Sequence, residues 1–124
     1  MTKIMKFTKE HEWVFLEGGN VAVVGITDYA QHALGDLVYV ELPKMGATYE
    51  KGQHFAVVES VKTAAEVYAP LSGKVIAVNK GLEADFDLLK SQENGWIAKF
   101  EIMQQGELDA LMSEREYEDY LAGL

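Results

Sequence analysis

The stretch ESVKTAA, residues 59–65, places a single lysine, Lys62, between two runs of strand-forming residues. The run before it reads FAVV (55–58), and the run after it reads EVYAP (66–70). Both contain the β-branched and aromatic residues that are typical of half-buried strands. The pattern therefore predicts a β-hairpin with Lys62 near its tip. An exposed lysine is commonly only a solvated charge, so the rest of the chain is needed to interpret this one.

The length and composition predict one globular domain. The chain has 124 residues, which favours a single domain spanning residues 1–124. Its 48% hydrophobic and 25% charged residues are ordinary for a soluble protein. The sequence contains no cysteine, which excludes disulfides, thiolate metal sites and cysteine nucleophiles. Any redox-active sulfur would have to be supplied by a cofactor.

The charge excludes one class of partner. The formal net charge is −9, and the segment from Glu107 onward holds six acidic residues against one base, Arg115, the only arginine of the sequence. This balance repels phosphate backbones and lacks the arginines that read bases, so no nucleic-acid partner is expected. No apolar run reaches the roughly 20 residues that span a bilayer, and the first residues contain no apolar export signal. We therefore expect a cytoplasmic protein with no membrane partner.

Other segments carry strand patterns. Residues 13–16 and 21–24 are predicted to pair through the turn EGGN (17–20), whose glycines and asparagine tolerate positive φ. Further strands are predicted at 35–42, 73–79 and 96–102, whereas 80–94 is polar and irregular.

Helix signals are found at two places. Thr27 can cap a short helix that runs through Gln31 and ends at Gly35. Residues 108, 111 and 112 share one helical face, and the capping-box pattern SERE (113–116) predicts a further helix containing residues 117–121. The predicted fold is mainly β, with two small antiparallel sheets facing each other, a short helix in the N-terminal half and helices at the C-terminus.

Several motifs occur together in one order along the chain. They are FTKEHEW (7–13), VGITDYAQ (24–31), LGDLVYVELP (34–43), ESVK followed by YAPLSGKV (59–62 and 68–75), and GWI (95–97). Together these motifs resemble those of the glycine cleavage system H-protein family. The resemblance implies the barrel-sandwich hybrid fold of lipoyl and biotinyl domains. It also implies that Lys62 carries lipoic acid in amide linkage, as N6-lipoyllysine.

The resemblance implies a non-catalytic carrier, whose lipoyl arm moves an intermediate between separate enzymes. A pyridoxal-phosphate glycine decarboxylase would load an aminomethyl group, and a tetrahydrofolate-dependent aminomethyltransferase would remove it. Dihydrolipoyl dehydrogenase would reoxidise the dithiol, and a lipoate ligase or lipoyl transferase would attach the arm to the protein. A monomer is expected.

Other site residues follow from the same resemblance. Glu59 and Gly73 match the family's pattern around the modified lysine, which implies a role in recognition by the ligase. Glu12, in the motif HEW, is implied to shelter the end of the arm by holding its ammonium group. His32 is a weaker candidate for that role.

Alternatives remain open. A biotin carrier is disfavoured, because its lysine lies between methionines, whereas Val61 and Thr63 flank Lys62. A lipoyl relay would pass lipoyl groups to the acyltransferases of 2-oxoacid dehydrogenases. A paralogous carrier for another oxidoreductase is also open, because FDLLK (86–90) replaces the family's usual PELVN.

The histidines and the large aromatics are given no site. His11, His32 and His54 lie far apart without ligand spacing, so no metal site is expected. The aromatic side chains at positions 13, 15 and 96 are interpreted as core.

Overall fold

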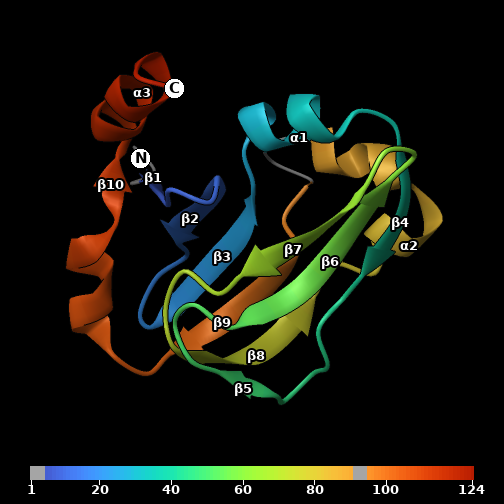
Figure 1. Ribbon diagram of the computed structural model, residues 1–124. Helices are drawn as coiled ribbons and strands as arrows, with labels where there is room; N and C mark the ends of the chain where they lie inside the picture. The colour runs from blue at the N-terminus through green and yellow to red at the C-terminus, as the bar shows by residue number, and fades with distance from the viewer. Residues whose placement is uncertain (1–4, 91–94) are drawn as a thin grey trace.

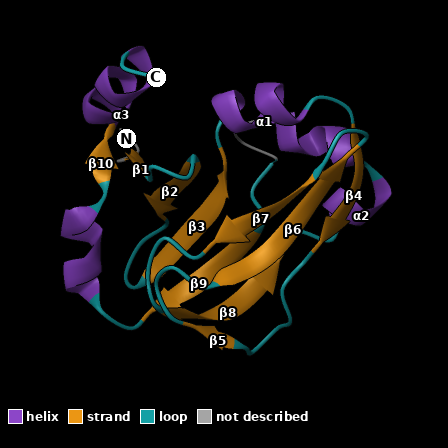
Figure 2. Ribbon diagram, in the orientation of Figure 1, coloured by secondary structure: helices purple, strands orange, loops and turns teal. Residues whose placement is uncertain are grey.

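The computed structural model describes residues 5–90 and 95–124 and contains two antiparallel sheets packed face to face (Figures 1 and 2). The larger sheet has the order β10 (Met112–Ser113), β1 (Met5–Phe7), β2 (Glu12–Leu16), β3 (Val21–Ile26), β9 (Ala98–Ile102), β8 (Gly73–Val78), β5 (Thr48–Tyr49). The smaller sheet has the order β4 (Leu37–Glu41), β6 (His54–Ser60), β7 (Ala64–Tyr68). The predicted fold class and the predicted long strands are confirmed.

The main core lies between the two sheets. Alternate residues of each strand face inward, so Val24, Val58 and Phe100 are fully buried. Phe100 meets Phe55 edge to face, with ring centroids 5.1 Å apart. Burial of a side chain of this size contributes roughly 1.5–3 kcal/mol, so the sandwich provides a rigid base for the β6–β7 hairpin.

A second cluster covers the outer face of the larger sheet. Trp13 is buried there with Phe7 and Tyr117, while Phe15 and Trp96 pack partly buried against them. This confirms that the large aromatics are packing residues.

The two capped helices form as predicted. α1 (Asp28–Leu34) begins after Thr27, whose hydroxyl accepts from the Ala30 amide at 3.4 Å, and ends at Gly35, which has φ +80°. α3 (Glu114–Ala122) begins after Ser113 with the complete capping box. Within the described residues, none of the helices has the length and apolar character needed to cross a bilayer.

Two predictions about local structure were wrong. Residues 108–112 do not form one helical face, because the 3-10 helix η2 (Gln105–Ala110) ends before Leu111 and Met112 pairs with Phe7 in the sheet. The segment predicted to be irregular contains α2 (Gly81–Ala84) and the 3-10 helix η1 (Phe86–Lys90). They bury Leu82 and Leu89 against the core. The rest of that prediction, at 91–94, lies outside the described residues.

Candidate functional site

Lys62 lies exposed in the turn between β6 and β7, as predicted. Figure 1 shows this hairpin. The Ser60 amide donates to the Thr63 carbonyl at 2.8 Å, which closes the turn. The Ser60 hydroxyl oxygen also accepts from the amides of Lys62 and Thr63, each at 3.2 Å. Because these bonds fix the backbone on both sides of it, the root of the Lys62 side chain has a defined position.

The tip of the hairpin is also fixed from outside. The Val61 amide donates to the carbonyl of Asp36 at 3.0 Å, which ties the turn to the segment that follows α1. The Lys62 side chain runs over Gly35, where an added Cβ would lie 3.5 Å from Lys62 Cε. The lysine therefore starts beside the C-terminal end of α1, where helix carbonyls favour a cation.

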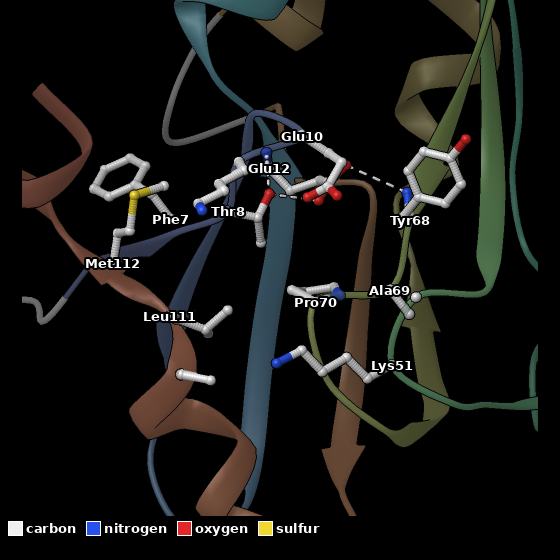
Figure 3. A pocket seen from close by; sticks show the side chains of 13 residues that line it. Phe7, Thr8, Glu10, Glu12, Lys51, Tyr68, Ala69, Pro70, Leu111 and Met112 are labelled. Atoms are coloured by element: carbon white, nitrogen blue, oxygen red, sulfur yellow. Dashed lines mark hydrogen bonds between the residues drawn. The ribbon is translucent and has the colours of Figure 1, made fainter. Parts of the chain in front are cut away.

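Glu12 is buried, not a surface residue at a strand end. Only 2% of Glu12 is exposed, and its carboxylate accepts from the Thr8 hydroxyl at 2.6 Å and from the Tyr68 amide at 3.3 Å (Figure 3). Burial raises the pKa of Glu12 to about 7, although both hydrogen bonds act in the opposite direction. A carboxyl with this pKa changes charge near neutral pH.

Glu12 lines two cavities. One, of about 340 Å³, lies between Thr8 and Phe7 on one wall and Pro70 and Leu111 on the other (Figure 3). The second, of about 200 Å³, follows β7 and is lined by Ala65, Glu66 and Val67 together with α1 residues Ala30, Ala33 and Leu34. The second cavity has mainly apolar walls with carboxylates at its margin, which suits a flexible apolar chain that ends in a cation.

Glu59 lies near the tip, on the outer face of the smaller sheet. It pairs with Tyr39 on one side and with Ala64 on the other, and it is half-buried rather than fully exposed as expected. The structure therefore brings Glu59 close to Lys62.

Gly73 lies elsewhere. It is the first residue of β8, beyond the end of β7 that is farther from the tip. It is buried there and pairs with Ile102. A Cβ at Gly73 would come 2.7 Å from the Glu101 carbonyl oxygen. The glycine therefore permits the close approach of two strands. A role in ligase recognition stays a prediction, and the structure does not place Gly73 beside Lys62.

The three histidines lie apart from one another, each in different surroundings. His11 Nδ1 lies 2.8 Å from the Tyr117 hydroxyl, and burial lowers the pKa of His11. His54 lies 3.3 Å from the Glu66 carboxylate, and His32 is exposed on α1. In the described part of the chain, no group of three or more histidine or acidic side chains is placed to hold a metal.

Sequence reasoning missed Glu66 and the small residues Ala30 and Ala33, which line the cavity along β7. The alternation of β7 could have placed Glu66 on the outer face of the hairpin. No local signal could have shown that α1 would bring its alanines against β7, because that contact depends on how the sheets pack.

A sandwich of two antiparallel sheets that presents one lysine on a fixed hairpin defines a carrier domain of the lipoyl-domain type. The family model of the glycine cleavage H-protein matches residues 5–123. The chain therefore belongs to the glycine cleavage H-protein family, whose members are lipoyl-bearing carriers of the glycine cleavage system.

Individual relatives agree with this assignment. The chain is 48% identical to the glycine cleavage system H protein of Thermotoga maritima over 122 residues, covering 97% of this chain and 98% of that protein. It is 51% identical to the corresponding protein of Xanthobacter autotrophicus over 123 residues, covering 98% and 97%. The crystal structure of the H protein from Mycobacterium marinum superposes with a TM-score of 0.84 at 30% identity and covers both chains completely.

Proposed function

We propose that this chain is one lipoyl-carrier domain, residues 1–124, that bears its lipoyl group on Lys62 and serves the glycine cleavage system. Its partners would be glycine decarboxylase, aminomethyltransferase and dihydrolipoyl dehydrogenase, and a lipoate ligase or lipoyl transferase would load it. In this proposal the protein is a cytoplasmic monomer and contributes no catalytic side chain.

The observation that carries the proposal is the position of Lys62. Its side chain is exposed at the tip of a hairpin whose backbone is held by Ser60 and tied to Asp36. An attaching enzyme can therefore reach Nζ while the root of the arm stays fixed. Tethering of this kind raises the effective concentration of a carried group at each partner's active site.

The residues along β7 fit such an arm. A lipoyl group supplies a dithiolane that can accept and release a small group and undergo reduction, a chemistry that a chain without cysteine lacks. An extended lysine with its lipoyl chain reaches on the order of 14 Å, which carries it from the turn along much of β7. The apolar cavity beside β7 would therefore shelter the arm, with Glu12 at its far end as the group that holds an ammonium.

Intact mass spectrometry after incubation with lipoate, ATP and a lipoate ligase tests the attachment site. The wild-type protein and the control Lys74→Arg, altered at another exposed lysine, should gain the mass of one lipoyl group. Lys62→Arg should gain nothing, because its guanidinium stays protonated and is no nucleophile. A mass gain on Lys62→Arg would contradict the site.

The pathway is tested separately. Loaded wild-type protein should support glycine-dependent release of carbon dioxide by glycine decarboxylase, and unloaded protein should not. A loaded protein that is inactive in this assay but active with another lipoate-dependent oxidoreductase would contradict the proposed partners.

A further inference from the structure

A bulge in β4 exposes two neighbouring side chains beside the hairpin tip. β4 is an edge strand paired with β6, and the pairing passes from Leu37 opposite Ser60 to Tyr39 opposite Glu59, which leaves Val38 without an opposite residue. Neighbouring residues of a regular strand point to opposite faces, but a bulge re-aims them. Val38 and Tyr39 are consequently both exposed, by 47% and 49%.

A third exposed apolar side chain lies in the turn itself. Val61, next to Lys62, is 68% exposed, and its amide bonds to Asp36 just ahead of the bulged strand. We call Val38, Tyr39 and Val61 the tip surface. Exposed apolar side chains scattered singly need no explanation, whereas a group of them around one functional residue indicates a contact surface.

Carboxylates border the tip surface. Glu59 lies between Tyr39 and Ala64 on the outer face of the smaller sheet, and the next row on that face contains Glu41 and Glu66. Lys62 itself loses its charge when it is acylated. A complementary partner would present an apolar depression bordered by basic side chains.

We infer that the tip surface is the docking site for the enzyme that attaches the lipoyl group to Lys62, and that this enzyme contacts it with an apolar, basic-rimmed surface. The inference rests on the proposed function. Attachment replaces an N–H bond of the neutral Lys62 amine with an amide bond to the lipoyl carbonyl. With a lipoyl adenylate as donor, AMP leaves and the proton of the amine passes to solvent.

The attaching enzyme differs from the other partners in how close its active site must come to the Lys62 backbone. Lysine Nζ lies about 6 Å from its own Cα, so the attaching active site must come that close to the backbone of the turn. Enzymes that use a finished arm act on the order of 14 Å from the same Cα and need not touch β4. The tip surface is therefore matched to the attaching enzyme, and a central aromatic such as Tyr39 is the kind of residue that dominates protein interfaces.

The test measures loading rates as a function of carrier concentration, with lipoate, ATP and a lipoate ligase, by intact mass spectrometry. Tyr39→Ser and Val61→Ser should each raise the KM for the carrier about tenfold, as expected for loss of an interface contact, with little change in kcat. Glu41→Lys should also raise KM, and the KM of the wild-type protein should rise with salt. Met103→Ser is the control, because Met103 is 61% exposed and follows β9 rather than the turn.

The outcomes separate the two proposals. If the wild-type protein gains no lipoyl group, both the proposed function and this inference are overturned. If the wild-type protein is loaded and the Tyr39 and Val61 variants have the KM of Met103→Ser, only the inference is overturned. Thermal unfolding of each variant shows whether it is folded, and Val61→Ser decides the matter should Tyr39→Ser be unfolded.

Discussion

The Glu12 carboxylate accepts a hydrogen bond from the backbone amide of Tyr68 at 3.3 Å, which joins the larger sheet to the last residue of β7. This contact lies at the end of the hairpin opposite Lys62. The amide of an edge strand would otherwise be unpaired there, and burial makes an unpaired donor costly. Glu12 thus has a structural partner in the smaller sheet and also lines two cavities.

The buried Glu12 should make stability depend on pH. Its pKa rises from 4.5 to about 7 on folding, so between these values the native state binds more protons than the unfolded state. The free energy of unfolding should therefore decrease as the pH rises through this window, by about 3 kcal/mol at most. The contribution is fully present below about pH 4.5 and lost above about pH 7.

Chemical denaturation of wild-type and Glu12→Gln protein across this pH range checks the prediction. The glutamine can still accept from Tyr68 but cannot ionise, so its stability should vary less with pH. Glu83→Gln, altered at an exposed glutamate, should retain the wild-type slope. Parallel pH profiles for Glu12→Gln and wild-type protein would contradict the assignment.

The Tyr117 hydroxyl should stabilise the packing of α3 against the larger sheet. It lies 2.8 Å from both His11 Nδ1 and Thr27 Oγ1, while the ring stacks on Phe7 at 4.7 Å. Tyr117→Phe keeps the stack but removes both hydrogen bonds, which leaves Thr27 Oγ1 with only the Ala30 amide, so we expect a loss of about 1–3 kcal/mol in thermal or denaturant unfolding. Tyr120→Phe removes only a long, exposed bond to Lys9 and should change stability far less.

Gly73→Ala separates packing from recognition. Because its Cβ would lie 2.7 Å from the Glu101 carbonyl oxygen, the variant should lose about 1–3 kcal/mol of stability. Lipoylation is then measured at a temperature where both proteins are folded. A slower rate for the folded variant would support the predicted recognition role, and an equal rate would leave Gly73 with packing alone.

The local features of the site could be predicted from sequence. The hairpin around Lys62 is formed by residues close in the chain, with strand-forming runs on both sides of the turn. The caps at Thr27 and Ser113 are likewise made by neighbouring residues. Such features depend on short-range chemistry, which a sequence displays directly.

The features that were missed depend on distant residues. Glu12 is an ordinary strand-end glutamate in sequence, and its hydrogen bond to the Tyr68 amide, 56 residues away, depends on how the two sheets pack. The strands β1 and β10 have three and two residues, which is too few for an alternating pattern to be detected. They also pair with each other from opposite ends of the chain. The extra residue at Val38 follows from the register of β4 on β6, which the alternation of β4 alone does not reveal.

Glu12 should also protect a cationic group carried on the arm. The cavity beside β7 is lined by Glu12, so an ammonium there would meet its carboxylate in surroundings from which much water is excluded. Binding of a cation favours the ionised form of Glu12 and lowers its pKa, so protection should strengthen as the pH rises through about 7.

The lifetime of aminomethyl-loaded protein without partner enzymes measures this protection. Glu12→Gln should shorten the half-life severalfold, because a glutamine offers the ammonium a neutral acceptor in place of a charged one, which makes a hydrogen bond about half as strong. Lipoylation of Lys62 should be unchanged, since Glu12 lies at the other end of β7 from the turn. Glu101→Gln, altered at an exposed residue of β9, is the control and should keep the wild-type half-life. Equal half-lives for Glu12→Gln and Glu101→Gln would show that Glu12 gives no shelter.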